Sequence, residues 1–258
     1  MTPFNFHRMY LTQSLDGFPT LPEQISIPID YKEQSEMTNF VDGSGDFNYM
    51  PISLRFWYMR NLSETVLDIE RDDYHIPNNN IFYADFSNTK LSGYKIPTMI
   101  GLNQLQGVNI FNCDINSMDE DQLKLFPRLK YFNARYNNLY HMNLKMLLHH
   151  DKLEWLDLGY NKLKNIPPQL ISNLPALRYM SLHGNPLVTG SLDVENNQNL
   201  KQLDLSECSL VNMTDIFLDQ LEMLSIKSEQ NLILNISNNR FECSCETLKM
   251  IHWFQHTM

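Results

Sequence analysis

The sequence predicts an α/β repeat solenoid, a horseshoe with a parallel sheet along its concave side and short helical or irregular segments on its convex side. Composition and periodicity predict this fold. The 258 residues include 36 Leu and 28 Asn but only 9 Gly, and 29 of the Leu residues follow residue 100. An excess of this kind indicates internal repeats. The chain indeed resembles itself at a spacing of 23 to 24 residues.

The repeating unit reads Leu-x-x-Leu-x-Leu-x-x-Asn-x-Leu, and residues 153–163 match it at every defined position. Units in the same frame begin at residues 81, 105, 129, 177 and 200, and a seventh follows from residue 231 after a longer gap. Each unit predicts a short strand with inward apolar side chains. One unit cannot bury its apolar edge alone, so neighbours are expected to stack into a parallel sheet.

The ninth position of the unit is expected to form a ladder of buried polar side chains. An amide there can donate to and accept from backbone groups of adjacent turns, and a small Cys can occupy the same slot. We therefore interpret the two Cys at this position as buried structural residues, and not as nucleophiles or metal ligands. The ladder residues are Cys113, Asn137, Asn161, Asn185, Cys208 and Asn239.

The remainder of each unit must return along the convex side. Apolar residues spaced by three, such as Leu123 and Phe126, predict short helical or 3₁₀ turns there. The pair Pro167-Pro168 argues against long helices in its unit. The segment 213–227 is the best candidate for a longer helix, because it lies where the spacing between units stretches to 31 residues.

The chain is expected to divide into three parts. Residues 1–80 form a degenerate N-terminal segment or degenerate repeats, in which Leu54, Trp57 and Met59 fit one weak unit. Residues 81–241 carry the clear repeats. Residues 242–258 begin a cysteine-containing C-terminal cap and are incomplete. An uncapped solenoid exposes its core. The true start is therefore either missing or formed by residues 1–80.

The repeat resembles that of leucine-rich repeat proteins over residues 81–258, and three features narrow the resemblance to Toll-like receptor ectodomains. These are the 24-residue period, the segment Leu-Glu-Trp-Leu-Asp-Leu-Gly-Tyr-Asn-Lys-Leu at 153–163, and Cys-Ser-Cys-Glu-Thr-Leu at 243–248 followed by Trp253. In that family a helix with a Trp follows Cys-x-Cys, and two further Cys complete two disulfides. The resemblance implies that Cys243 and Cys245 are disulfide residues whose partners are missing.

The same resemblance implies a piece of a longer protein, or a truncated gene product, on the extracellular side of a membrane receptor. A membrane helix and a cytoplasmic signalling domain would follow downstream, so the chain would meet a membrane only through that missing segment. The chain itself carries no apolar stretch of signal-peptide or membrane-spanning length. Three glycosylation sequons agree with an extracellular position, at Asn61, Asn212 and Asn235.

The outward positions of the strands supply the candidate binding surface. Stacking places Tyr83, Gly107, Tyr131, Trp155, Tyr179 and Gln202 in one column, and Asn88, Asn112, Tyr136, Tyr160, Gly184 and Glu207 in another. Aromatic residues and Arg are typical of binding hot spots. The alternative is lateral packing of these rings over the sheet. The candidate ligand-binding residues are Tyr131, Trp155, Tyr179, Tyr136, Tyr160, Arg135 and Arg178.

Other classes of function find little support. A net charge of -10 argues against nucleic-acid binding, and no catalytic constellation, metal site or cofactor motif is expected. No carboxylate can be assigned to His149, His150 or His183, so these side chains are expected to be exposed. The predicted function is recognition of a protein or microbial ligand, with a possible receptor dimer. The alternatives are an intracellular scaffold for protein–protein interaction and a secreted adhesion or matrix protein.

Overall fold

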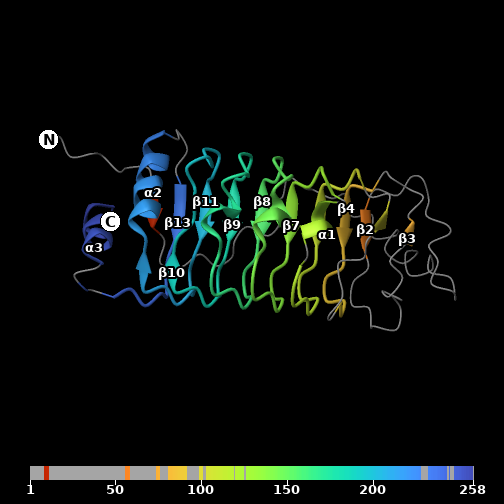
Figure 1. The fold of residues 1–258 in the computed structure, drawn as a ribbon, viewed down its shortest axis with the longest axis horizontal. Coiled ribbons are helices and arrows are strands. Elements are labelled where there is room, and N and C mark those ends of the chain that lie inside the picture. Colours follow the sequence, from red (N-terminus) through yellow and green to blue (C-terminus); the bar gives the residue numbers. More distant parts are fainter. Residues whose placement is uncertain are drawn as a thin grey trace.

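Parallel strands stand side by side along the long axis of the molecule (Figure 1). The computed structural model describes residues 9–11, 56–58, 74–75, 81–91, 99–100, 103–118, 120–124, 126–227, 232–242, 244 and 247–257. Over these residues the predicted solenoid is confirmed.

The concave sheet has nine strands in the order β1-β13-β11-β9-β8-β7-β6-β4-β2, and every neighbouring pair is parallel. Apart from β1, which pairs with β13, the order follows the chain. The strands are β1 (Met9–Leu11), β2 (Phe56–Tyr58), β4 (Tyr83–Asp85), β6 (Gly107–Asn109), β7 (Tyr131–Asn133), β8 (Trp155–Asp157), β9 (Tyr179–Ser181), β11 (Gln202–Asp204) and β13 (Leu232–Asn235).

The register joins equivalent positions of successive repeats. Leu156 pairs with Phe132 on one side and with Met180 on the other, and all three side chains are fully buried. The same apolar slot therefore stacks on itself from repeat to repeat and forms one continuous core. Burying each such side chain contributes about 1.5–3 kcal/mol relative to leaving it exposed.

The convex side is built from short segments and one long helix. α1 (Glu120–Lys124) and the 3₁₀ helices η3 (Leu144–Leu147) and η4 (Pro168–Leu170) cover three of the repeats. Two short parallel pairs lie outside the main sheet, β3 (Tyr74–His75) with β5 (Met99–Ile100) and β10 (Thr189–Gly190) with β12 (Asn212–Met213). The long helix is α2 (Asp215–Lys227), visible at one end of the sheet in Figure 1.

Helix α2 agrees with the predicted helix at 213–227 but begins two residues later. The reason is Thr214, whose side-chain oxygen accepts a hydrogen bond from the Phe217 N–H at 3.3 Å. A side-chain oxygen at this place satisfies an N–H that the first turn of a helix leaves unpaired. Met213 instead pairs with Gly190 in the short convex sheet.

The ninth-position residues bond to backbone groups of the preceding repeat. Asn161 Nδ2 donates to the carbonyls of Ala134 and Leu158, both at 2.9 Å, and its Oδ1 accepts from the Leu139 N–H at 3.0 Å. Asn137, Asn185 and Asn239 repeat this arrangement in their own units. Each amide therefore joins two adjacent turns of the solenoid through hydrogen bonds to backbone groups.

Cysteine occupies the same slot with fewer bonds. Cys113 Sγ donates to the Phe86 carbonyl at 3.0 Å, and Cys208 Sγ donates to the Leu182 carbonyl at 3.2 Å. Both thiols are free and buried. Burial raises their pKa to about 12, so neither forms a thiolate readily near neutral pH.

At the C-terminal end, α3 (Leu248–Thr257) follows the last strand and packs Trp253 into the core. Cys243, Cys245 and Asn61 lie outside the described residues. At the other end, β2 places Trp57 opposite Ala84, in the register of the later units. Of the described helices, none combines the length and the apolarity that crossing a bilayer requires.

The stability of the fold should fall at acid pH because of His150, which was expected to be exposed and is instead buried. Its Nε2 lies 3.0 Å from the Leu123 carbonyl, and burial lowers its pKa below the ordinary value. The unfolded chain then binds a proton before the folded one as the pH falls. The free energy of unfolding therefore keeps its full value above about pH 6.5. Below that pH it decreases, by up to about 1.4 kcal/mol per pH unit.

Urea unfolding of the wild type and of His150→Asn between pH 5 and pH 8 measures this effect. We expect the variant to lose part of the acid decline, since the uncharged amide has no proton to gain. His141→Asn changes an exposed histidine of the same region and should leave the decline unaltered. Parallel curves for all three proteins would show that His150 does not carry the acid sensitivity.

Candidate functional site

A second ladder of polar side chains runs along the concave face. Its members stand at the fifth position of each repeat, directly after the central residue of the strand. In each repeat the fifth-position side chain accepts a hydrogen bond from the N–H two residues later; Asp157, for example, accepts from Gly159 at 2.8 Å. The sequence interpretation missed this column, although a polar residue recurs at every fifth position. Its members are Asp85, Asn109, Asn133, Asp157, Ser181, Asp204 and Asn235. This ladder turns the chain after each strand and fixes the residues that follow.

The contacts sort the candidate binding residues into two groups, and the first lies on the strands themselves. Tyr131, Trp155 and Tyr179 are neighbours in the register. Trp155 is only 3% exposed, whereas the two tyrosines are half-buried. Arg178 lies beside them, with Nε 3.6 Å from Glu154 Oε2. Because so little of Trp155 is exposed to solvent, replacing it would change the stability of the fold more than the binding of a partner.

The second group lies just beyond the strands, at the eighth position of the repeat. The backbone at this position is left-handed in every clear unit, with positive φ at Asn88, Asn112, Tyr136, Tyr160, Gly184, Glu207 and Asn238. Asn and Gly adopt this conformation with little strain, whereas a bulky side chain does so rarely. The φ values of Tyr136 and Tyr160 are 59° and 49°. These two tyrosines are therefore held in a conformation that the repeat does not favour for their type.

The two tyrosines form a stacked pair on the surface. Their ring centroids are 4.4 Å apart and the planes differ by 12°. The guanidinium of Arg135 lies 5.2 Å from the Tyr136 centroid and 5.0 Å from the Tyr160 centroid. Beneath it, Arg135 Nη1 is 3.9 Å from Asp157 Oδ2. Burial raises the pKa of Asp157 while Arg135 opposes that shift.

The neighbouring repeats complete this aromatic row. Phe111 and Tyr136 pack edge to face with ring centroids 5.3 Å apart, and His183 and Tyr160 do the same with centroids 4.6 Å apart. The ring of Tyr160 also covers Gly184, where an added Cβ would lie 2.7 Å from Cδ1 of the ring. Glycine at this place therefore makes room for the tyrosine of the preceding repeat. We call Phe111, Tyr136, Tyr160, His183 and Arg135 the aromatic row.

His183 does not have the expected exposed position, since its side chain is 17% exposed and bonded on both ring nitrogens. Nδ1 lies 2.6 Å from Ser206 Oγ, and Nε2 lies 2.7 Å from the Tyr160 hydroxyl. Ser206 donates its only hydroxyl proton to Asp204 at 2.5 Å. Nδ1 must then donate to Ser206, and in the neutral ring Nε2 accepts from Tyr160. Glu207 Oε2 lies 3.9 Å from the same Nε2.

This arrangement holds side chains in place and does not activate a nucleophile. A serine nucleophile needs a base that takes its proton, but the proton of Ser206 points to Asp204 and His183 donates to the oxygen. Within the part of the chain that the structure describes, no group of three or more His, Cys, Asp or Glu side chains could hold a metal ion. The aromatic row instead presents rings and a guanidinium that can contact a partner.

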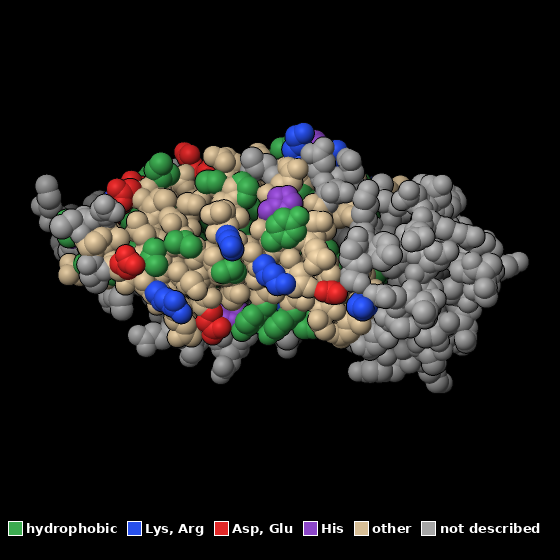
Figure 2. All heavy atoms as spheres, turned by 60° about the horizontal axis from the view of Figure 1, so that its bottom comes forward, with side chains coloured by type: hydrophobic (Ala, Val, Ile, Leu, Met, Phe, Trp, Pro, Cys, Tyr) green, Lys and Arg blue, Asp and Glu red, His purple; other side chains and the backbone are tan. Residues whose placement is uncertain are grey.

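Hydrophobic side chains form several small groups on the face shown in Figure 2, separated by basic and acidic side chains. Where the apolar groups of a surface are dispersed, a local cluster of aromatic and charged residues is the most suitable place for a partner to bind. The aromatic row is such a cluster, with Tyr136 exposed to 44%.

The candidate glycosylation sites differ in how far their side chains are exposed to solvent. Asn212 is half-buried in β12. Asn235 is buried, its Nδ2 donates to Ser206 Oγ at 3.2 Å, and its Oδ1 accepts from the Ser237 hydroxyl at 2.9 Å. A glycan on that nitrogen would break the contact with Ser206. The fold therefore argues against Asn235 as an acceptor.

Comparison with known proteins agrees with this geometry. Residues 127–187 match the family model described as leucine rich repeat. They include β7, β8, β9 and the ladder residues between them. The protein is a leucine-rich repeat solenoid.

Proteins similar to this leucine-rich repeat solenoid include a Toll-like receptor. It is 36% identical to human Toll-like receptor 5 over 106 residues, which are 41% of this chain and 11% of the receptor. It is 26% identical to human CD180 antigen over 160 residues, 61% of this chain and 23% of that protein. It is 21% identical to the zebrafish transforming growth factor beta activator LRRC33 over 219 residues, 74% of this chain and 30% of that protein. The chain thus resembles Toll-like receptor ectodomains and spans a minor part of each relative.

Proposed function

We propose that the chain is a non-enzymatic recognition module from the ectodomain of a Toll-like innate immune receptor. Its partner would be a protein or a microbial molecule, and the receptor would dimerise on the extracellular side of a membrane. The similarity to Toll-like receptor 5 and the family resemblance of residues 153–163 support this proposal. Within it, residues 81–241 form the recognition solenoid. Residues 242–258 begin the cap in which Cys243 and Cys245 would be disulfide-bonded.

The observation that carries the proposal is the left-handed backbone of the two stacked tyrosines. At the same position the other repeats have residues such as Asn88, Asn112 and Gly184. A bulky side chain held in this region costs about 1–3 kcal/mol. Tyr136 and Tyr160 therefore do not improve the fold by their backbone preference. Their contribution is a broad aromatic surface beside the Arg135 guanidinium.

The composition of the aromatic row favours a protein partner over a small ligand. Tyr and Arg are enriched among the residues that contribute most to binding at protein interfaces. Tyr also buries a large area at a modest cost in conformational entropy. Arg135 lies near both rings. Glu207 borders the row with a 45% exposed side chain and offers a carboxylate to a partner.

The experiment exchanges each tyrosine for the residue that the repeat prefers. In the double variant Tyr136→Asn, Tyr160→Asn we expect the free energy of unfolding to change by less than about 1 kcal/mol, since relief of strain offsets lost stacking. We expect binding to weaken by about thirtyfold or more, as removal of two hot-spot residues does. Immobilised wild-type and variant proteins are tested by interferometry against fractionated bacterial extracts and against host extracellular proteins.

The matched control is Tyr140→Asn, which removes an exposed tyrosine outside the aromatic row. It should retain all binding. A fraction that binds the wild type and the double variant equally would exclude the aromatic row as the recognition surface. Binding to host proteins alone, sensitive to the double variant, would favour an adhesion or scaffold role over microbial recognition.

A further inference from the structure

Helix α2 has apolar side chains on two sides, although only one side faces the core. Phe217 and Leu221 are fully buried against the solenoid. On the outer side Ile216 is 71% exposed and Met223 is 48% exposed. Residues seven apart lie on one face of a helix, so the two form a single outer stripe. A helix that only covered the core would carry polar residues there.

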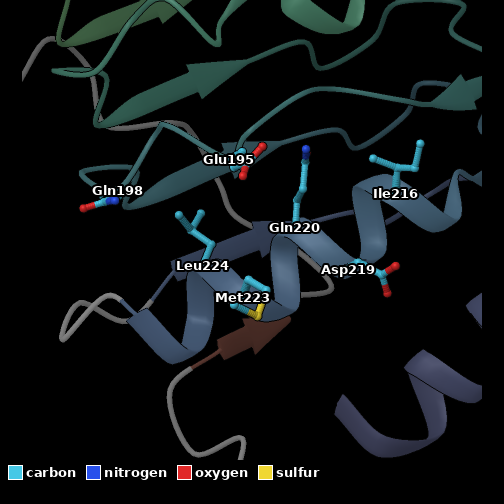
Figure 3. A pocket seen from close by; sticks show the side chains of 7 residues that line it. All are labelled: Glu195, Gln198, Ile216, Asp219, Gln220, Met223 and Leu224. Carbon is cyan, nitrogen blue, oxygen red and sulfur yellow. The ribbon is translucent and has the colours of Figure 1, made fainter.

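A hollow of about 250 Å³ lies beside this stripe, between α2 and the preceding convex loop. Figure 3 shows Glu195 on that loop, with Gln220 pointing from the helix towards it. Gln220 holds the loop in place, because its Oε1 accepts from the Val194 N–H at 3.0 Å and its Nε2 donates to Asp193 at 3.0 Å. The hollow therefore lies between two elements that are hydrogen-bonded to each other, and Ile216, Met223 and Leu224 supply its apolar lining.

The charge around the hollow is negative. Glu195 and Asp219 line it, both are exposed, and the described residues that line it include no Lys or Arg. The whole chain carries a formal charge of -10, which adds to the local potential. A second copy of the chain would meet like charge on this face, and a nucleic acid would be repelled.

The structure already contains one example of how a cation docks here. Lys249 of α3 donates to Asp219 Oδ2 at 2.8 Å and to the Asp215 carbonyl at 3.4 Å. The next residue before it, Leu248, is exposed. Exposed ion pairs contribute little to stability, so an incoming lysine can compete with or extend this contact.

We propose that the hollow beside α2 docks a segment of a partner protein in which Lys or Arg flanks an apolar side chain. The apolar side chain covers Ile216 and Met223, and methionine adapts its shape to such a contact. The basic groups pair with Glu195 and Asp219. This surface is separate from the aromatic row, so the two can be tested independently.

The probe is a short fluorescein-labelled peptide with Lys residues around a central Leu, and its partner is the same peptide with Glu in place of Lys. Fluorescence anisotropy should show binding of the basic peptide alone, weakened by salt because the contacts are exposed. Ile216→Ser and Glu195→Lys should each weaken binding by about tenfold. Both side chains are exposed, so the variants should fold normally.

Matched controls are Val188→Ser and Asp151→Lys, which alter an exposed apolar residue and an exposed acid elsewhere. Both should bind the basic peptide as the wild type does. Equal binding of the acidic peptide, equal loss in the controls, or no binding of either peptide would overturn the proposal. So would a concentration-dependent dimer in sedimentation that Ile216→Ser abolishes, since the occupant would then be a second copy.

Discussion

Replacing Asn161 by Ala should lower the free energy of unfolding by about 2–4 kcal/mol, because it leaves one buried backbone N–H without a partner and removes one of two donors from two buried carbonyls. The Leu139 N–H donates to this side chain, and the carbonyls of Ala134 and Leu158 accept from it. Each carbonyl keeps a second donor, Asn137 for Ala134 and Asn185 for Leu158. The side chain is buried between two turns of the solenoid, so these bonds are shielded from solvent. Few other single substitutions in the described chain remove so many buried hydrogen bonds at once.

The substitution should also change the shape of the unfolding transition. A solenoid is stabilised by contacts between nearest neighbours, so weakening one junction separates the repeats on either side. Circular dichroism in increasing urea should show a lower midpoint and a broader or divided transition for Asn161→Ala. Asn199→Ala is the matched control, because Asn199 makes a single exposed bond to the Pro175 carbonyl at 2.8 Å. It should cost less than about 1 kcal/mol. If both variants lost the same free energy of unfolding, the buried hydrogen bonds of Asn161 would contribute no more than an exposed one.

The arrangement of the repeats could be predicted from the sequence because one geometry recurs. Once the positions of the unit at 153–163 are known, each strand residue is expected to lie beside the residue at the same position of the next unit in a parallel sheet. Tyr131, Trp155 and Tyr179 are therefore adjacent as predicted. The helix at α2 was predicted by the same logic, because a stretched spacing leaves residues that the short convex turn cannot accommodate.

Burial and hydrogen-bond partners within the aromatic row could not be predicted in this way. They depend on where each side chain points between two different repeats, and the template does not contain that information. His183 is covered because Gly184 allows the Tyr160 ring to lie over its repeat. Trp155 is buried although its slot faces outward. The left-handed eighth position was visible only indirectly, through Asn and Gly in the other units.

Replacing Gly184 by Ala should lower the free energy of unfolding by about 2–4 kcal/mol, from two separable causes. The first is the backbone, since φ is +69° and a Cβ is disfavoured there. The second is the ring of Tyr160, which the new Cβ would approach to 2.7 Å. Moving that ring breaks its bond to His183 and its stack on Tyr136.

A double-mutant cycle separates the two causes. In a Tyr160→Ala background the ring is absent, so Gly184→Ala should cost only the backbone part, about 1–2 kcal/mol. Gly190→Ala is the control for a glycine of ordinary φ, where the nearest side-chain atom belongs to the flexible Met213. Urea unfolding of the four cycle members gives the coupling energy directly. If Gly184→Ala cost the same with and without the tyrosine, the ring would not rest on this glycine. The aromatic row would then be held by Arg135 and His183 alone.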